Sequence, residues 1–337
     1  MDGLLVVDKP AGPTSHDVVA RVRRALGERR IGHTGTLDPA ATGVLALVLG
    51  RATRLAQFLS GSDKSYEAVV RLGFSTDTAD AQGRAMDAAI DAPLPRREAI
   101  EAALDAFRGT FLQQPPAFSA KKIDGKRSHK LARAHRKNFQ QVLAGSEIAP
   151  SRLGADSEPA SLRLPQPATV TASAIDIIAV DADTVKLRVD CSAGFYIRSL
   201  AHDLGERLGV GGHIVALRRT RSGDFSLADA IALDTVERQP AWAAARVIPL
   251  AGMLPRLAPV VLTADGVRKA IHGRELGLGD CVSGFGLRDS GLAAPDESRI
   301  LAPESRFYRL LDEAGALVAI ARPASRSTAL HPSVVLV

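Results

Sequence analysis

The sequence predicts an α/β (α+β) protein, in which a large domain of strands and helices precedes a small β-rich C-terminal module. Three observations support this prediction. Apolar residues make up 46% of the 337 residues, enough for a sizeable core. Strand-like and helix-like segments are interspersed up to about residue 250, and only strand-like segments with turns stand out beyond 255. A chain of 337 residues also suggests two domains, or one large domain with an appendage.

The N-terminal part begins with a strand followed by a helix. Gly3–Asp8 is apolar and ends at Lys9-Pro10, which indicates a strand. Thr14 or Ser15 can cap the next helix, whose apolar residues up to Leu26 share one face. A Gly-rich stretch at 32–39 separates this helix from the elements that follow. We expect strands at Val44–Leu49 and Ser65–Leu72 and a helix at Arg96–Phe107 that stops at Gly109.

The second half starts with a change of composition. Residues 138–168 contain scattered Ala, Ser, Pro and Gly, which predicts a long loop. A boundary is expected near 240–255. Before this boundary we predict paired strands at Thr169–Val180 and Thr184–Cys191, a helix at Tyr196–Leu208 and a short strand at Ile214–Leu217. Beyond it we predict strands at Val260–Leu262, Arg306–Leu311 and Leu317–Ala321. A hairpin turn joins the last two of these strands.

The charge distribution favours a polyanionic partner. The formal net charge is +6, which by itself is explained equally well by solubility. Residues 121–137, however, contain eight cations and one acid, and a solvated helix face usually mixes the two signs. These cations are Lys121, Lys122, Lys126, Arg127, Lys130, Arg133, Arg136 and Lys137, and a second cluster consists of Arg218, Arg219 and Arg221. Phosphate groups are the natural partners of such clusters.

The remaining composition points to a cytoplasmic protein without a metal. Cys191 and Cys281 are the only cysteines and have no metal-ligand spacing, and the histidines show none either. Two cysteines in so long a chain indicate a reducing compartment. No apolar run reaches membrane-spanning length, and no secretory signal is visible at the N-terminus.

The Gly-rich stretch holds an acid, Asp38, directly before Pro39. The proline disfavours helical dihedral angles at Asp38, and the flanking glycines allow a ligand to approach closely. Taken alone, an ordinary turn explains such a stretch best. A phosphate-binding P-loop is excluded because no Lys-Ser/Thr pair follows the glycines. A glycosidase-type pair of carboxylates stays open on the residues alone.

Residues 32–45, GHTGTLDPAATGVL, resemble the catalytic motif of the TruB family of pseudouridine synthases. Five further segments resemble motifs of the same family in the correct order, at 8–15, 63–66, 73–83, 194–200 and 212–219. The resemblance covers most of residues 1–250. It implies a pseudouridine-synthase fold, with a large mixed, mainly antiparallel sheet flanked by helices in a catalytic domain at 1–250. It also implies a PUA-like RNA-binding module at 255–337.

The resemblance implies that the chain isomerises uridine to pseudouridine in the T-loop of tRNA, at position 55, without a cofactor. Asp38 matches the family's invariant aspartate. Isomerisation must break the N1–C1′ bond, turn the uracil and rejoin it through C5. A carboxylate can attack the sugar or the base, or assist elimination, and the three alternatives stay open. Arg198 is the best candidate for its counter-charge.

The other site residues are also implied by the resemblance. Tyr66 would stack on the target base and could transfer a proton, Tyr196 would line the same pocket, and Leu217 would form an apolar wall. His33 would contact the RNA where the extruded base leaves its stack. Lys9 and Pro10 would support the site structurally.

Residues 110–140 resemble the family's thumb-like RNA-binding segment. RNA contacts are expected from Lys121, Lys122, Lys126, Arg127, Arg218 and Arg219. His129 and Lys130 depart from the family's tyrosine and acid, and the loop at 138–168 is longer than the family pattern, as a tolerated surface insertion would be.

We expect the T-arm of tRNA as partner, no membrane, no obligate protein partner and a monomer. Two alternatives remain. The first is a non-catalytic RNA-binding or tRNA-folding protein on the same scaffold, which the presence of Asp38, Tyr66 and Arg198 disfavours. The second is a guide-RNA-dependent pseudouridine synthase, which the compact C-terminal part disfavours.

Overall fold

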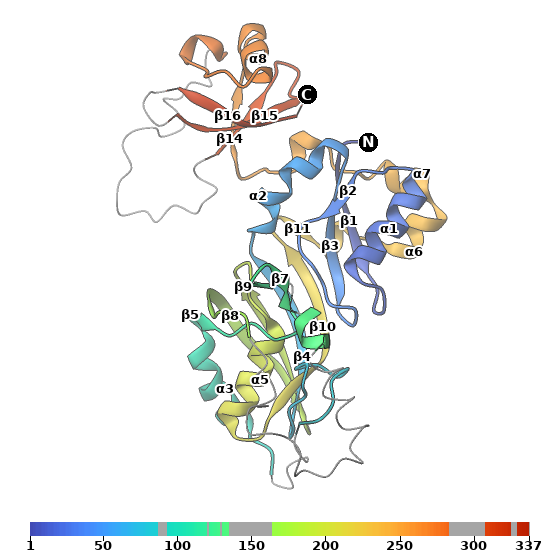
Figure 1. Cartoon of the computed structure of the whole chain (residues 1–337), viewed down its shortest axis with the longest axis vertical. Coiled ribbons are helices and arrows are strands. Elements are labelled where there is room, and N and C mark those ends of the chain that lie inside the picture. Colours follow the sequence, from blue (N-terminus) through green and yellow to red (C-terminus); the bar gives the residue numbers. More distant parts are fainter. Residues whose placement is uncertain are drawn as a thin grey trace, which may run out of the picture. The chain divides into compact units, whose positions relative to one another are not determined.

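The computed structural model describes residues 1–86, 93–119, 121–128, 130–134, 164–282, 307–324 and 329–336. The chain forms two compact units (Figure 1). Unit 1 comprises Met1–Ser62 and Arg221–Val337, and unit 2 comprises Asp63–Thr220.

Unit 1 begins with the predicted strand and helix. β1 (Gly3–Lys9) pairs antiparallel with β3 (Thr42–Leu49) and parallel with the short β12 (Ile231–Ala232), so this part of the sheet is mixed. β3 is buried along nearly all its length, as its unbroken apolar sequence predicts. β2 (Ile31–His33) pairs with the other edge of β3.

Helix α1 (Ser15–Leu26) is bounded by two sequence signals. Thr14 and Asp17 form a reciprocal capping box at its start, and Gly27 ends it with φ +65°, a left-handed conformation that glycine adopts without strain. The buried face of the helix includes Val18, Val19 and Val22. The short helices α6 (Leu233–Arg238) and α7 (Pro240–Ala244) contact α1 on the same side of the sheet (Figure 1).

A four-stranded sheet forms the C-terminal part of unit 1, which confirms the predicted small β-rich module. Its order is β13-β14-β15-β16, with β13 parallel to β14 and the other pairs antiparallel. α8 (Ala264–Ile271) contacts β15 and β16. The strands are β13 (Ala258–Val261), β14 (Tyr308–Leu311), β15 (Leu317–Pro323) and β16 (Leu330–Val335). The boundary at 250–255 stays a prediction.

This sheet shares a core with the rest of unit 1. Ile320 and Leu336 belong to the same buried cluster as Val6 and Leu254. Arg309 of β14 also hydrogen-bonds the segment before β13: Nε donates to Leu257 O (2.9 Å) and Nη1 donates to Ala251 O (2.8 Å). Burial lowers the pKa of its guanidinium.

We expect Arg309→Met to destabilise unit 1. The substitution leaves two carbonyl oxygens without these donors, which costs about 1–3 kcal/mol of unfolding free energy. Urea unfolding measures the change. The control is Arg268→Met, since Arg268 is 71% exposed and pairs with Asp265 on the surface of α8; we expect a change within about 0.5 kcal/mol there. Equal stability of the two variants contradicts the prediction.

Unit 2 is built on an antiparallel sheet. β4 (Lys64–Leu72) pairs with β9 (Thr184–Cys191), β9 with β8 (Ala168–Asp181), and β8 with β5 (Gly109–Gln113). β10 (Gly212–Ser222) lies next to β4. Helices α3 (Arg97–Leu104) and α5 (Ile197–Leu208) contact each other and pack against β8 and β4, respectively. The predicted α/β class, with a mixed, mainly antiparallel sheet and flanking helices, is thus confirmed.

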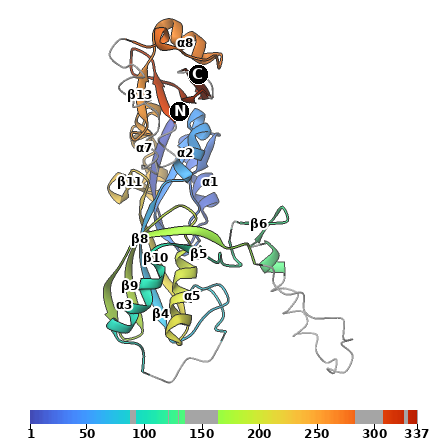
Figure 2. The same cartoon turned by 90° about the vertical axis from the view of Figure 1, so that its left-hand side faces the viewer.

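A short hairpin of unit 2 stands apart from the sheet. It consists of β6 (Lys122–Ile123) and β7 (Lys126–Arg127), and Figure 2 shows it projecting to one side of the unit. It falls in the segment predicted to be thumb-like. Most of the loop predicted at 138–168, as well as His129, lies outside the described residues; β8 already begins at Ala168.

Candidate active site

Asp38 lies in unit 1, in a turn between β2 and β3. The Ala41 N–H donates to Asp38 O (3.1 Å), which closes a β-turn with Pro39 at its second position. The preceding residue is tied to α1 in both directions. Ser15 Oγ accepts from Leu37 N (2.9 Å) and donates to Leu37 O (3.1 Å). The carboxylate is therefore presented from a fixed turn.

Lys9 fastens the far side of this turn. Its side chain is fully buried at the end of β1. Nζ donates to three main-chain oxygens, Pro10 O (2.9 Å), Pro39 O (3.0 Å) and Ala41 O (2.7 Å). The Gly12 N–H donates to Pro39 O as well (2.9 Å). Lys9 therefore binds two main-chain carbonyls of the turn itself, and its supporting role in the site stays a prediction.

His33 ends β2, five residues before Asp38. Its ring meets that of His16 of α1 edge-on, with 5.3 Å between the ring centroids. His33 is partly exposed and His16 exposed. A polar aromatic surface thus lies at the entry to the segment that carries Asp38.

Tyr66 and Leu217 lie on neighbouring strands of unit 2. Tyr66 is on β4, opposite Val189 of β9, and is 9% exposed. It alternates with solvent-side residues such as Glu67, so it shares the inner face of β4 with Ala68. Leu217 is on β10 and is partly buried. The two strands thus supply an aromatic and an aliphatic side chain.

Tyr196 and Arg198 occupy the start of α5. Tyr196 is the residue that precedes its first turn, and Arg198 lies within that turn. Arg198 is only 6% exposed, so it is not a surface arginine. Nη1 donates to Thr78 O (3.1 Å) and Nη2 donates to Phe118 O (2.8 Å), and Asp80 Oδ2 lies 3.9 Å from Nη1. The guanidinium is therefore held by two loops at once.

The predicted catalytic and substrate-binding residues thus fall into two groups. Asp38 and His33 belong to unit 1, on the segment between β2 and β3. The residues of unit 2 come from β4, β10 and the start of α5; they are Tyr66, Leu217, Tyr196 and Arg198. In each unit they lie on segments fixed by main-chain hydrogen bonds.

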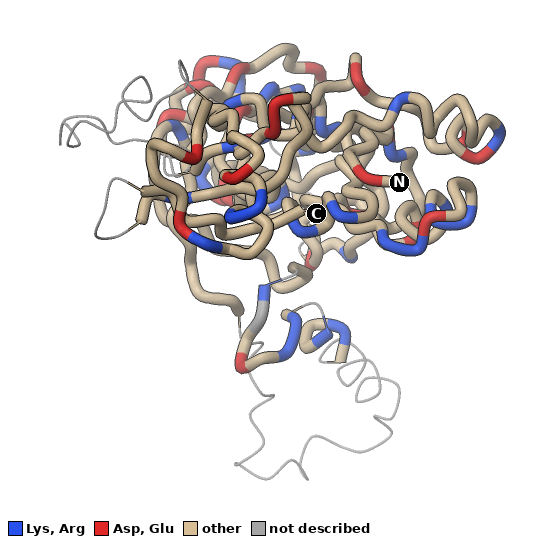
Figure 3. Tube along the Cα trace, turned by 90° about the horizontal axis from the view of Figure 1, so that it is seen from above, with Lys and Arg blue, Asp and Glu red and all other residues tan. Residues whose placement is uncertain are grey.

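The predicted RNA contacts differ in exposure. Lys121, Lys126 and Arg127 are exposed on or beside the β6–β7 hairpin, and Lys122 belongs to β6. Figure 3 shows that Lys and Arg predominate on this segment. On β10, Arg218 is partly exposed but Arg219 is 2% exposed. Arg219 is therefore the residue of this set least suited to meet a phosphate.

Lys64 is another buried cation, and it lies close enough to Arg219 to be affected by its charge. Lys64 of β4 is 6% exposed, and burial, followed by the positive charge of Arg219, lowers the pKa of its ammonium to about 8. Sequence reasoning did not single out Lys64 as a titrating group. It lies two residues before Tyr66, on the same face of β4.

We expect the lowered pKa of Lys64 to make stability depend on pH. The pKa of a lysine in an unfolded chain is about 10.4. Between pH 8 and that value, residue 64 therefore binds more protons in the unfolded chain than in the folded one. The unfolding free energy contributed by this group therefore rises with pH, by at most about 3 kcal/mol. Urea unfolding of wild type and Lys64→Met at pH 7.5 and 9.5 measures it. The same pH dependence in both proteins contradicts the assignment.

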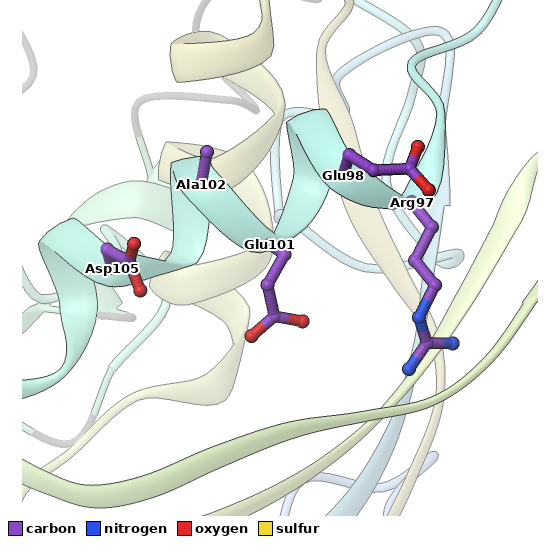
Figure 4. Close-up of a pocket in the computed structure, with 5 residues that line it drawn as sticks. All are labelled: Arg97, Glu98, Glu101, Ala102 and Asp105. Atoms are coloured by element: carbon purple, nitrogen blue, oxygen red, sulfur yellow. The ribbon is translucent and has the colours of Figure 1, made fainter.

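A surface depression on α3 does not resemble a nucleotide site. Figure 4 shows its lining, in which Arg97 and Ala102 accompany three carboxylates, Glu98, Glu101 and Asp105. Carboxylates repel phosphates, and none of the motif residues lies there. Within the described ranges, no group of three His, Cys, Asp or Glu could hold a metal ion, and no helix is long and apolar enough to cross a membrane.

The chain matches two family models. One is described as TruB family pseudouridylate synthase (N terminal domain), over residues 23–148, and the other as tRNA pseudouridylate synthase B C-terminal domain, over residues 198–260. Curated relatives named tRNA pseudouridine synthase B are similar over most of their length. The protein from Solibacter usitatus (strain Ellin6076) is 38% identical and covers 100% of both chains. That from Thermobifida fusca (strain YX) is 43% identical, over 89% of this chain and 93% of the relative.

The fold also matches a solved structure. A chain in the crystal structure of a Cbf5-Nop10-Gar1 complex aligns with a TM-score of 0.65 and 25% identity, over 99% of this chain and 85% of that one.

Proposed function

The chain belongs to the TruB family of pseudouridine synthases, and from this premise we propose that it acts on the uridine at position 55, in the T-loop of tRNA, with Asp38 as nucleophile. The coarser activity follows from the family: the chain is an isomerase that converts uridine to pseudouridine in tRNA. The observation that carries the assignment of Asp38 as nucleophile is the fixed turn, which presents one carboxylate from a main chain held by Lys9 and Ser15.

The reaction adds and removes no atoms overall. The N1–C1′ bond breaks, the uracil turns, a C5–C1′ bond forms, and the proton on C5 is lost to solvent while N1 gains one. Asp38 attacks the sugar or the base, or assists elimination, and each route needs a carboxylate held close to the extruded nucleotide. A turn held by both Lys9 and Ser15 supports this role because it limits the movement of the Asp38 main chain.

The residues of unit 2 receive complementary roles. Tyr66 stacks on the uracil, and Tyr196 and Leu217 line the rest of the pocket. Arg198 supplies the positive charge for the Asp38 carboxylate. The Arg198 guanidinium is buried and donates to two carbonyl oxygens, so its orientation is fixed before RNA binds. His33 contacts the RNA and helps to replace the partner of the flipped base.

RNA binding is proposed for the cations of the hairpin segment, Lys121, Lys122, Lys126 and Arg127, and for Arg218 and Arg219 of β10, although Arg219 is buried. The catalytic domain spans 1–250, and a PUA-like module at 255–337 assists it. The solved relative is part of a complex with Nop10 and Gar1. For this chain we propose a monomer that acts in the cytoplasm without a protein partner or cofactor.

Tritium release tests the proposal. The purified chain is incubated with tRNA transcripts containing 5-tritiated uridine, either wild type or with cytidine at position 55. We expect one equivalent of tritium in water from the first transcript and background from the second. Release only after an RNA fraction is added indicates a guide-dependent enzyme. Binding without release under either condition indicates a non-catalytic RNA-binding protein.

A further inference from the structure

Gln113, the last residue of β5, forms a two-point hydrogen bond with the main chain of Tyr196. Its side chain is 2% exposed. Nε2 donates to Tyr196 O (3.0 Å), and the Tyr196 N–H donates to Oε1 (2.8 Å). A side-chain amide thus pairs with the main chain as a neighbouring strand would. Because 83 residues separate the two, this contact is tertiary.

The contact lies where α5 begins. Tyr196 has an extended main chain, with φ −111° and ψ 109°, and its own side chain makes no capping bond. Tyr196 O also accepts from the Leu200 N–H (3.1 Å), the first bond of the helix. Gln113 therefore fixes the residue from which the helix starts, at an end where main-chain groups lack helical partners.

Two further bonds connect the same segment with the first turn of α5. Ser199 Oγ donates to Gln114 O (2.7 Å), and Arg198 Nη2 donates to Phe118 O (2.8 Å). Pro115 and Pro116 lie between these acceptors and restrict the backbone. The Gln113 side chain and the main-chain carbonyls of Gln114 and Phe118 thus hold the main chain of Tyr196 and the side chains of Ser199 and Arg198.

We propose that Gln113 is a positioning residue for the isomerisation. By fixing the Tyr196 main chain, it sets the place of the Tyr196 ring and of the helical turn that carries Arg198. The role rests on the proposed function, which assigns both residues to the uracil site. Gln113 itself is buried, and its side-chain amide is used in the two bonds to the Tyr196 main chain. Its loss displaces catalytic groups without removing an RNA contact, so it lowers the rate and spares affinity.

Three variants test the role. Gln113→Leu removes both bonds. Gln113→Glu keeps an acceptor for the Tyr196 N–H but lacks a donor for Tyr196 O. The matched control is Gln114→Leu, because the Gln114 side chain donates to Pro115 O and Pro165 O and its main-chain bond with Ser199 survives the change.

The single-turnover rate of pseudouridine formation at saturating enzyme is compared with the dissociation constant for tRNA. We expect Gln113→Leu to be about 10- to 100-fold slower, with affinity within about threefold of wild type. Gln113→Glu should fall between Gln113→Leu and wild type, and Gln114→Leu should match wild type. A rate for Gln113→Leu within about twofold of the Gln114→Leu rate overturns the proposal. If Gln113→Leu does not fold, the same criterion applies to Gln113→Glu.

Hydrogen exchange separates this proposal from the proposed function. Amides at 196–200 should exchange faster in the Gln113 variants than in Gln114→Leu, and unchanged exchange overturns the proposal. If wild type forms no pseudouridine, the proposed function fails. The exchange measurement then still decides whether Gln113 holds the start of α5.

Discussion

Asp38→Asn is expected to form no measurable pseudouridine while binding tRNA within severalfold of wild type. Asparagine has nearly the same shape and accepts the same main-chain geometry, so the turn closed by Ala41 N and Asp38 O should persist. What it loses is the negative charge on which the proposed nucleophilic role of Asp38 depends. We expect the single-turnover rate to fall by at least about 10³-fold, as is common when a covalent nucleophile is removed. Tritium release and filter binding on the same preparations measure both quantities.

The control for this variant is Asp234→Asn. Asp234 is a surface carboxylate of the same unit, on α6, where it pairs with Arg238 four residues along. Such exposed pairs contribute little to stability, so wild-type activity is expected. Asp38→Asn with a rate close to that of Asp234→Asn would rule out the nucleophile assignment. Loss of tRNA binding in Asp38→Asn would instead assign Asp38 to recognition.

The sequence was sufficient to predict the elements whose signal is local. The apolar run of β3 predicts a buried strand, and Thr14, one of the two caps predicted for the first helix, is the residue that caps α1. The position of Asp38 in a turn follows from Pro39. In each case the residues that cause the structure are neighbours in the chain. The turn alone does not indicate a chemical role for Asp38; the expected role comes from the resemblance to the family motifs.

Contacts between distant segments could not be predicted in this way. β5 was missed because it is five residues long, begins at a glycine and exposes 71% of Leu112, so neither alternation nor burial marks it. Because that strand was not predicted, the hydrogen bonds between Gln113 and the Tyr196 main chain could not be predicted either. The carbonyl partners of Arg198 could not be predicted either, because Thr78 and Phe118 lie 120 and 80 residues away in the sequence.

Lys9 illustrates how a local motif acquires its meaning only in three dimensions. In the sequence it is a lysine before a proline at the end of a strand. In the structure its side chain is fully buried, and its ammonium donates to three main-chain oxygens, of which Pro39 O and Ala41 O belong to the Asp38 turn. A buried cation is costly unless its donors are used. Satisfying them here fixes the turn relative to β1.

We therefore expect Lys9→Met to impair catalysis more than folding. Methionine fills similar space and removes the cost of a buried charge, which partly offsets the loss of the donors; the unfolding free energy should fall by about 1–3 kcal/mol. The turn, however, loses two of its fixed points, and a displacement of about 1 Å can slow a reaction about 10²-fold. Urea unfolding and single-turnover rates measure the two effects separately.

Lys186→Met is the matched control for Lys9→Met. Lys186 is 43% exposed on β9 and pairs with Glu67 at the surface, so its loss should leave both the rate and the unfolding free energy close to wild type. A wild-type rate in Lys9→Met would show that the Asp38 turn keeps its geometry without the ammonium. If the rate falls only in proportion to the unfolded fraction, Lys9 contributes to stability alone. A slow but fully folded Lys9→Met enzyme is the result that links the buried lysine to the position of the carboxylate.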